Sequence, residues 1–553
     1  MLRQCPSPSR ATRSLVLAGA TVLAALNPSV APAQGSPMAA AGVALQAGLP
    51  RLVSPFRQAV AAAVAEDPVL SAFYRGRDYA PFWTGAEDAP RRAALMAALA
   101  AAPLHGLPLR DGEALRSAFA AARSEGDRGR LDVAMTRAFL RHVRAARAGV
   151  LVPRQIDPGL LREVAPPDPA ETLEAFAAAA EPAAFLRALM PATEEYARLV
   201  RARMTLVSVA AQGGWGPAVP SGALRPGDTG PGVIALRDRL VRMGYLAPTA
   251  AADYGPALTA AVQAVQFAHG LTPDGVAGEA TIAAINVPLA DRLGAIAVAM
   301  ERERWLGADR GARHIWVNLA DFSAKVIDDG KVTFATKAVI GATLAEKNTP
   351  EFSRLMTYME VNPDWTVPPG IIRRDYLPKL QSNPNALGHL QVVDARGRVV
   401  PRDQIDFAAY SARNFPFNLR QPPGATNALG RVKFMFPNPW SIYLHDTPER
   451  HLFARESRAY SSGCVRLNDP FDFAYVLLAR QEADPRAAFH RVLDSGRQER
   501  IFLAEPVPIH LDYRTAFTGT KGELHFRRDI YGRDGAILAA LVKAGVDPAA
   551  MPR

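Results

Sequence analysis

The sequence predicts a multidomain α+β protein in which a helical first half is followed by a mainly β domain. Three observations lead to this prediction. The chain has 553 residues, apolar residues recur at helical spacing up to about residue 290, and short β-prone segments dominate from Ile315 onward. Because one hydrophobic core seldom serves more than about 300 residues, we expect three or four domains.

The first 33 residues are typical of a secretory signal peptide. Three arginines precede the apolar segment 14–26, which is too short to span a bilayer, and Ala31-Pro32-Ala33 provides a cleavage site. We therefore expect an exported mature chain without a transmembrane segment. Without those arginines the formal charge is 11 − 3 = +8. This basic excess suits an anionic polymer, and export argues against nucleic acid as the partner.

Residues 50–210 are predicted to form a helical domain. They are rich in Ala, Leu and Arg at helical spacing, as in 91–99, and strand-like alternation is rare. Short Pro and Gly interruptions such as 103–108 separate the helices. This part of the sequence contains no evident chemical site.

A Gly- and Pro-rich linker leads into a small three-helix unit at 224–290. Apolar residues recur at helical spacing over 233–243, and Gly244 follows where a helix C-cap is expected. A second helix is predicted over 258–269, closed by Gly270, and a third follows from Gly278.

A mainly β domain is predicted at 312–510, with 511–553 as a C-terminal extension. Within it, Asp328-Asp329-Gly330 is a hairpin turn signal, and Asp469-Pro470 predicts the N-cap and first residue of a helix ending near Leu478. The predicted strands are 315–319, 324–327, 338–341, 356–361, 432–436, 442–444 and 499–503. An insertion at about 373–420 breaks the strand rhythm, and we expect it to cap a cleft.

Cys464 is the only cysteine outside the predicted signal peptide. An unpaired cysteine in an exported chain is either buried and inert or reactive. A free thiol with a pKa near 8.5 is only about 3% ionised at pH 7, so a reactive thiol needs a partner such as an imidazole. His445 ends a strand-like run 464 − 445 = 19 residues earlier. Gly463 leaves room beside the sulfur, and the amides of 463–465 are candidate oxyanion donors.

The residues alone therefore leave two interpretations open, a cysteine acyl-transfer site and a buried structural cysteine. A papain-like endopeptidase is disfavoured, because its cysteine precedes its histidine and begins a long helix. The sequence gives no basis for a structural zinc or a metalloprotease.

The pattern of His445 with Ser461-Ser462-Gly463-Cys464-Val465-Arg466 resembles the L,D-transpeptidases with a YkuD-type catalytic domain. Ser462 stands where that family usually has a second histidine, as in its large Gram-negative branch. Further segments of this chain fit the branch, among them 362–369, 427–434 and 529–534. The unit containing His269-Gly270-Leu271-Thr272-Pro273-Asp274-Gly275 resembles a peptidoglycan-binding domain. Residues 50–210 would then be the helical scaffold domain of the branch.

The resemblance implies a role for each matching residue. Cys464 would attack a donor tetrapeptide stem at the L-centre of diaminopimelate, releasing D-alanine and leaving a thioester. His445 would carry the proton, with its ring oriented by a backbone carbonyl such as that of Asp446. A diaminopimelate amine of an acceptor stem would complete a 3→3 cross-link. Oxyanion contacts would come from Gly463, Cys464 and Tyr443, and substrate contacts from Arg466, Ser462 and Trp365.

No cofactor and no metal are expected, and the resemblance places the enzyme in the periplasm, in cell wall biogenesis. A structural ion pair for Arg466 and a core position for Trp365 remain open alternatives. An L,D-carboxypeptidase or cross-link hydrolase would use the same cysteine with water as the acceptor. A non-catalytic wall-binding scaffold is the third alternative.

Overall fold

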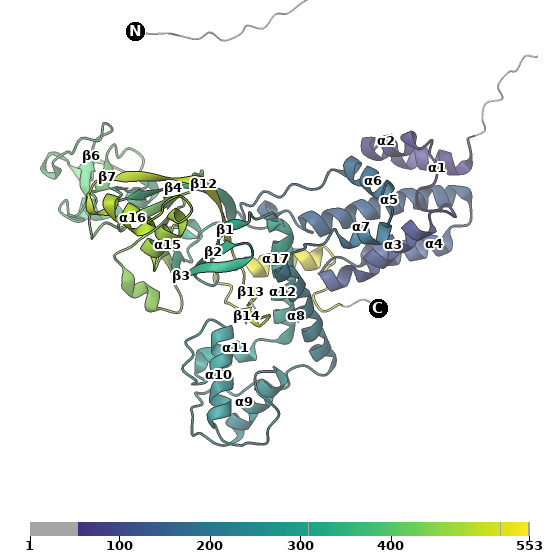
Figure 1. Cartoon of the computed structure of the whole chain (residues 1–553), viewed down its shortest axis with the longest axis horizontal. Coiled ribbons are helices and arrows are strands. Elements are labelled where there is room, and N and C mark those ends of the chain that lie inside the picture. Colours follow the sequence, from purple (N-terminus) through teal and green to yellow (C-terminus); the bar gives the residue numbers. More distant parts are fainter. Residues whose placement is uncertain (1–52, 308, 520, 551–553) are drawn as a thin grey trace, which may run out of the picture. The chain divides into compact units, whose positions relative to one another are not determined.

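The computed structural model describes residues 53–307, 309–519 and 521–550, and the predicted signal peptide at 1–33 lies outside them (Figure 1). Helices account for the first part of this region and a large sheet for the later part, as the sequence predicted. Within the described residues, no single helix is both long and apolar enough to cross a membrane. A bent helix pair, 279–286 with 289–306, meets that test by length and composition alone.

The N-terminal helices pack around an aromatic core that includes Trp83, Phe139 and Phe176. A buried carboxylate, Asp132, ties this core together, because it accepts hydrogen bonds from the Trp83 amide at 3.0 Å and the Tyr74 hydroxyl at 2.7 Å. The helices are α1 (Pro55–Val64), α2 (Pro68–Gly76), α3 (Ala89–Ala101), α4 (Arg110–Ala121), α5 (Glu125–Ala148), α6 (Pro169–Ala177), α7 (Pro182–Arg187) and α8 (Glu194–Ala211).

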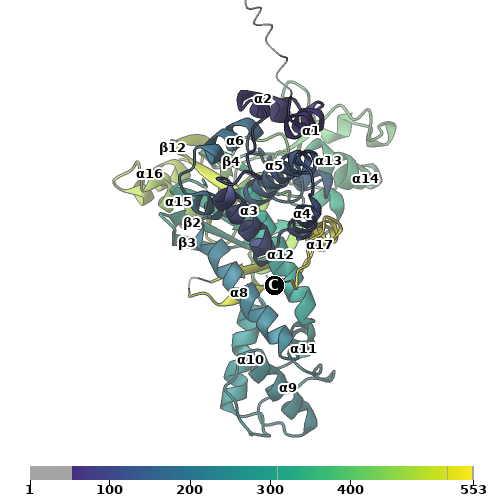
Figure 2. The same cartoon turned by 90° about the vertical axis from the view of Figure 1, so that its right-hand side faces the viewer.

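The predicted three-helix unit consists of α9 (Pro231–Arg242), α10 (Pro256–Ala268) and α11 (Glu279–Asn286), which group together in both views (Figure 2). Gly244 and Gly270 follow the first two helices with φ of +80° and +69°, a left-handed conformation that glycine adopts without strain. Both predicted helix ends are therefore confirmed.

The sequence reasoning missed α12 (Leu289–Leu306), a long helix that packs against α8 and α17 (Arg533–Lys543). Its last turns carry the charged run 301–304, which is fully buried. Each charge is paired. Arg302 pairs with Glu351 at 3.1 Å and with Asp534, and Glu301 pairs with Arg304 at 2.7 Å. Buried charges of this kind require partners, so α12 fixes the neighbouring segments around it.

Glu303 belongs to the same buried network. It accepts from Arg310 at 2.6 Å and is paired with Arg514, which also contacts Asp512 at 2.7 Å. These arginines lower the pKa of Glu303 to about 2, against burial, which raises it and is the largest single influence. A hydrophobic pattern alone gives no sign of such a network.

The mainly β domain is built on one sheet with strand order β10-β3-β11-β9-β8-β4-β12-β1-β2, and β2 also pairs with β3. Because β2 and β3 stand near opposite ends of this order and pair with each other, the sheet closes on itself. Strand β10 lies outside the closed part, paired with β3. The strands are β1 (Arg313–Asn318), β2 (Ser323–Asp328), β3 (Lys331–Gly341), β4 (Phe352–Val361), β8 (Val432–Met435), β9 (Leu444–His445), β10 (Ala459–Ser461), β11 (Val465–Leu467) and β12 (Glu499–Asp512). Fully buried apolar residues fill its interior.

Two local predictions are confirmed in detail. The β2–β3 hairpin turns at Asp329 and Gly330, whose φ values of +48° and +78° fit a tight two-residue turn. Helix α15 spans Pro470–Leu478, and α16 follows at Pro485–Asp494. Asp469 is the N-cap residue and Pro470 the first helical residue, as predicted, but the Asp469 side chain makes no capping hydrogen bond and instead accepts one from Thr336 at 2.8 Å.

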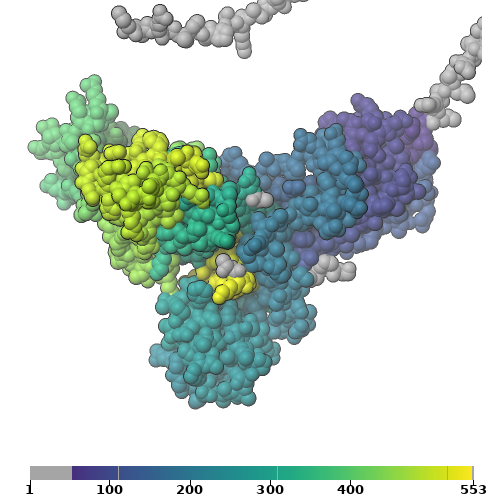
Figure 3. Space-filling model, in the orientation of Figure 1, coloured from purple at the N-terminus to yellow at the C-terminus, as the bar shows by residue number. Residues whose placement is uncertain are grey.

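The segment after β4 forms a substructure with its own three-stranded sheet, β5-β7-β6, and its own apolar cluster. Its elements are β5 (Trp365–Thr366), α13 (Pro369–Ile371), α14 (Leu377–Ser382), β6 (Gln391–Val393) and β7 (Asn418–Gln421). It begins before the predicted start at 373, because Trp365 pairs with Gln421. In light green, it projects from the surface in Figure 3. We call residues 365–421 the cap.

The remaining elements are the β13 (Ala516–Thr518) and β14 (Leu524–Phe526) hairpin and α17. Strand β12 continues to Asp512, pairing in parallel with β1. The predicted boundary at 510 therefore falls inside a strand, and the C-terminal extension continues directly from the sheet.

Candidate functional site

Strands β9 and β11 bring the two predicted catalytic residues close together. The strands are parallel, with Val465 opposite Leu444 and Arg466 opposite His445. Both Val465 and Leu444 are fully buried in the interior. His445 therefore faces away from that interior. Cys464 directly precedes β11, and its thiol contacts the hydroxyl of Tyr443, whose ring lies 5.6 Å from that of His445.

The Cys464 thiol is half-buried and lies 3.6 Å from the Ser441 carbonyl oxygen. Burial raises the pKa of the thiol, and contacts with the backbone and hydroxyl of Tyr443, along with the charges of Lys433 and Arg466, lower it only in part. The same hydroxyl lies against the sulfur, and burial together with that contact raises the pKa of Tyr443. The thiol is therefore protonated at neutral pH in this structure.

His445 is almost completely buried, at 4% exposure. Its Nδ1 lies 2.5 Å from the Asp446 carbonyl oxygen, the orienting contact that the sequence comparison implied. Burial, reinforced by the charges of Arg466 and Lys433, lowers the pKa of His445 to about 3. In the described part of the chain, no hydrogen bond joins this ring to the Cys464 thiol. The lowered pKa of His445 and the raised pKa of Cys464 both favour the neutral forms of the two side chains, so this structure does not favour a thiolate–imidazolium ion pair.

Asp446 acts through its backbone, since its carboxylate is engaged elsewhere. The carboxylate accepts from the Arg431 amide at 2.8 Å and the Thr447 amide at 2.7 Å. The Asp446 carboxylate also packs against Gly430: a Cβ on residue 430 would lie 2.3 Å from the Asp446 Cγ. Glycine at position 430 therefore leaves room for the Asp446 carboxylate, whose hydrogen bond to the Arg431 amide fixes the backbone next to His445.

Only one of the three candidate oxyanion amides is free. The Gly463 amide donates to Ser461 Oγ at 3.1 Å, and the Val465 amide to the Tyr443 carbonyl at 3.1 Å. The Cys464 amide has no partner within the described residues. In this conformation the available donors beside the sulfur are this amide and the Tyr443 hydroxyl. The prediction of Gly463 as a donor is not supported here, because its N–H is occupied.

A hydrogen-bonded brace holds the turn that carries Cys464. Ser461 Oγ donates to the Cys464 carbonyl at 2.5 Å, and Thr349 Oγ1 donates to the Gly463 carbonyl at 2.7 Å. Thr349 Oγ1 also accepts from the Gly341 amide at 2.9 Å. The Tyr531 hydroxyl, from the C-terminal extension, donates to the Gly341 carbonyl at 2.6 Å. Distant parts of the sequence thus meet beneath the turn.

Of the predicted substrate contacts, Arg466 is paired with Glu449, as the structural alternative proposed. Trp365 is 8% exposed in the apolar cluster of the cap, which Tyr443 also contacts. Ser462 is exposed, with no hydrogen bond among the described residues. Trp365 is therefore at once a core residue of the cap and a neighbour of the site.

Sequence reasoning missed the residues that surround the pair. Lys433, on β8, lies 4.9 Å from the centre of the Tyr443 ring, and its Nζ is 3.0 Å from a Glu360 carboxylate oxygen. Thr349 lies in a loop without regular structure. No motif marks either residue, and only the register of neighbouring strands would have indicated Lys433. Among the described residues, no cluster of His, Cys, Asp and Glu could hold a metal ion.

Family models match three segments of the chain. Residues 68–202 match a "Scaffold domain", 229–285 a "Putative peptidoglycan binding domain", and 312–497 the YkuD "L,D-transpeptidase catalytic domain". A curated protein of Haemophilus influenzae named "Putative L,D-transpeptidase" is 33% identical over 225 residues, 40% of this chain. The match spans 45% of that protein's length.

Two solved structures were also matched. The L,D-transpeptidase (residues 123–326) from Xylanimonas cellulosilytica shows 19% identity, with 54% of this chain and all of that chain covered, and a TM-score of 0.16. A "Fused Zn-dependent amidase/peptidase/peptodoglycan-binding domain-containing protein" from Clostridium acetobutylicum shows 13% identity over 53% of this chain and all of that chain, and a TM-score of 0.15. Scores this low carry no argument about the fold. The chain thus folds as a mixed α+β protein, and its segments match a scaffold domain, a peptidoglycan-binding domain and a YkuD L,D-transpeptidase catalytic domain in that order.

Proposed function

We propose that this chain is a periplasmic L,D-transpeptidase that forms 3→3 cross-links between peptidoglycan stems through a thioester on Cys464. The observation that carries the proposal is that Tyr443, just before β9, contacts both the Cys464 thiol and the ring of His445 within the segment that matches the catalytic domain. A structural cysteine would not need a histidine oriented on the adjacent strand.

The first half-reaction begins from the neutral pair. His445 has a lowered pKa, so its ring is unprotonated and can accept the thiol proton as Sγ attacks the carbonyl carbon of the donor amide. The Cys464 amide and the Tyr443 hydroxyl would stabilise the oxyanion. The C–N bond then breaks, His445 returns the proton to the departing amine, and D-alanine leaves with the diaminopimelate carbonyl bound to sulfur as a thioester.

In the second half-reaction, the side-chain amine of diaminopimelate on an acceptor stem attacks the thioester carbonyl. The amine loses a proton to His445, the C–S bond breaks, and the thiol is restored with that proton. If water replaces the amine, the product is a tripeptide and the enzyme is an L,D-carboxypeptidase. If the thioester forms from a stem that is already cross-linked and water resolves it, the enzyme is a cross-link hydrolase.

Incubation with purified disaccharide-tetrapeptide, followed by mass analysis, tests the proposal. A dimer with loss of D-alanine is expected from the native chain, and no product from Cys464→Ala, with unchanged melting temperature. Tripeptide alone would reject the transpeptidase in favour of the carboxypeptidase. Full cross-linking by Cys464→Ala would reject the thioester, and unchanged substrate with the native chain would favour a non-catalytic scaffold.

A carbapenem provides a second test that needs no acceptor. Its strained amide should acylate the Cys464 thiol, adding the mass of one inhibitor to the native chain. Cys464→Ala should show no added mass. Acylation at another residue would contradict the assignment of the nucleophile.

A further inference from the structure

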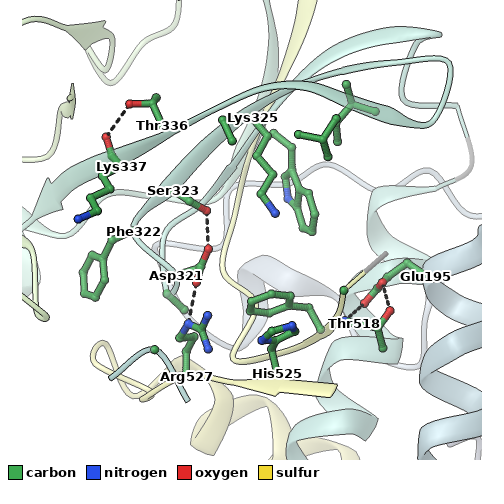
Figure 4. Close-up of a pocket in the computed structure, with 18 of the residues that line it drawn as sticks. Glu195, Asp321, Phe322, Ser323, Lys325, Thr336, Lys337, Thr518, His525 and Arg527 are labelled. Carbon is green, nitrogen blue, oxygen red and sulfur yellow. Dashed lines mark hydrogen bonds and ion pairs between the residues drawn. The ribbon is translucent and has the colours of Figure 1, made fainter. Parts of the chain in front are cut away.

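A row of charged and titratable side chains crosses the sheet at the level of His445. Arg500 on β12 is opposite Glu360 on β4, which is opposite Lys433 on β8. Lys433 is in turn opposite His445 on β9, and His445 is opposite Arg466 on β11. Because directly opposite residues share a face of the sheet, the whole row lies on the face of His445, away from the core. The large cavity drawn in Figure 4 is lined by none of these residues.

Lys433 is the member of the row that reaches Tyr443. Tyr443 stands two residues before His445, so it is a diagonal neighbour of Lys433 across the two strands, a separation that long side chains can span. The Lys433 Nζ lies 4.9 Å from the centre of the phenol ring. Within the described chain, no other cation makes such a contact with this ring. Lys433 therefore bears directly on the orientation of the Tyr443 side chain.

Glu360 fixes the Lys433 ammonium beside the ring. Its carboxylate is 5% exposed, with one oxygen 3.0 Å from Lys433 Nζ and the other 3.0 Å from Arg500 Nε. Burial raises the pKa of Glu360, but the hydrogen bonds and charges of the two cations bring it below its usual value, so the carboxylate is ionised at neutral pH. Because Arg500 pairs with Glu360 independently, loss of Lys433 would not leave this carboxylate unpaired.

The other contacts of Tyr443 fix its backbone more firmly than its ring. The Tyr443 carbonyl accepts from the Val465 amide at 3.1 Å, which ties the backbone to β11. The ring meets the His445 ring edge-on at 5.6 Å and packs against the apolar cluster of the cap. Apolar packing is not directional, whereas a cation over a ring face requires a defined ring orientation. The contact with Lys433 therefore helps to keep the hydroxyl against the Cys464 thiol.

The charge of Lys433 does not by itself favour proton transfer from Cys464 to His445. Burial has the largest influence on both groups, and the charges of Lys433 and Arg466 then lower the pKa of the thiol as well as that of the imidazole. For a proton that passes between the two groups, these effects oppose each other. Arg466 is in addition paired with Glu449. What remains is the effect of Lys433 on Tyr443.

We propose that Lys433 is a positioning residue for the reaction at Cys464. Anchored on Glu360, it holds the Tyr443 ring so that the hydroxyl stays beside the sulfur, where it can donate to the sulfur as the thiol proton leaves and then to the oxyanion. Lys433 makes no hydrogen bond to Cys464 or His445 among the described residues, so it acts through Tyr443. This inference rests on the proposed acyl transfer at Cys464.

Carbapenem acylation of Cys464, followed by intact mass, tests this role in a double-mutant cycle with Tyr443→Phe. Lys433→Gln should slow acylation about tenfold, the size of one partly desolvated cation–π contact, and Lys433→Arg should restore most of the rate. In the Tyr443→Phe chain, Lys433→Gln should change the rate less than about twofold, because the hydroxyl that it positions is gone. Lys543→Gln, at an exposed lysine on α17, should acylate as the native chain does. Melting of Lys433→Gln should stay near native, because Arg500 still pairs with Glu360.

The pH dependence of Cys464 alkylation by iodoacetamide gives a second readout, one that a purely structural role would not move. Burial raises the pKa of the thiol, and Tyr443 and Lys433 lower it, so Lys433→Gln should raise this pKa further. The rise should be smaller in the Tyr443→Phe chain, where only the direct charge of Lys433 remains to be lost. If Tyr443→Phe acylates too slowly to measure, this alkylation cycle decides between coupled and independent action.

Native acylation in Lys433→Gln would overturn the proposal, and so would an equal loss with and without the Tyr443 hydroxyl. A Lys433→Arg chain as slow as Lys433→Gln would also overturn it. Release of D-alanine from disaccharide-tetrapeptide is scored separately. If the alkylation cycle shows coupling while the native chain releases no D-alanine, Lys433 stands as the residue that positions Tyr443 and the catalytic proposal fails. Normal release with an uncoupled cycle removes only the role of Lys433.

Discussion

Thr349→Val removes one hydroxyl from beneath the proposed nucleophile and changes little else. The side chain is fully buried, and valine has nearly the same shape. The hydroxyl donates to the Gly463 carbonyl at 2.7 Å and accepts from the Gly341 amide at 2.9 Å. Valine leaves both backbone groups buried and unpaired.

The stability loss follows from those two bonds. A net hydrogen bond contributes about 1 kcal/mol, and an unpaired buried group costs about 1–3 kcal/mol, so we expect roughly 3 kcal/mol in total. For a domain of this size that corresponds to a melting temperature lower by about 9 °C. The loop that carries Thr349 already packs tightly against β3, since a Cβ on Gly341 would lie 2.0 Å from the Lys347 carbonyl oxygen. It therefore cannot easily move inward to re-pair these groups.

The functional loss should be larger than the stability loss implies. Gly463 precedes Cys464, and a nucleophile misplaced by about 1 Å can lose on the order of 100-fold in rate. We expect Thr349→Val to lower the carbapenem acylation rate by about 10- to 100-fold, measured by intact mass below the melting transition. Thr349→Ser keeps the hydroxyl and should retain most of the rate. Wild-type acylation and melting in Thr349→Val would refute the brace.

The remaining predictions concern pH and three further positions. Because the pKa of His445 is lowered to about 3, kcat/KM should be flat from pH 5 to 8; an acidic limb near pH 6–7 would indicate an ion pair instead. Gly463→Ala, at φ +119° and with its Cβ 3.2 Å from Ile442, should cost about 1–3 kcal/mol and slow acylation; native behaviour in both assays would contradict this. Arg302→Met leaves the buried Asp534 without its ion-pair partner and Glu351 with Arg533 alone; it should cost about 3–5 kcal/mol in denaturant unfolding, and a loss below about 1 kcal/mol would count against the network. Burial lowers the pKa of His142 from about 6.5 to about 4, so the unfolded chain binds a proton more readily than the folded one and stability should fall as the pH drops from 6.5 toward 4; His142→Gln should flatten the acid side of a melting profile, and an unchanged slope would contradict it.

The sequence by itself determined the features that depend on neighbouring residues. Asp329-Gly330 specifies a two-residue turn because its backbone angles are easy for those residues. Pro470 marks the first residue of α15, and Gly270 the end of α10, for similarly local reasons. The sequence also predicted that Cys464 and the upstream His445 act together, because few residue types carry acyl-transfer chemistry.

The tertiary structure decided what those residues experience. Burial sets the protonation of Cys464 and His445, and no sequence pattern reports how much water reaches a side chain. The Thr349 brace joins residues more than a hundred positions apart, and only folding brings them together. The charged run 301–304 looks like a solvated helix face in sequence, yet it is completely buried, and the ion-pair partners of Arg302 and of Glu303 include residues from distant segments. Local angles are encoded locally, whereas desolvation and long-range pairing exist only in the packed chain.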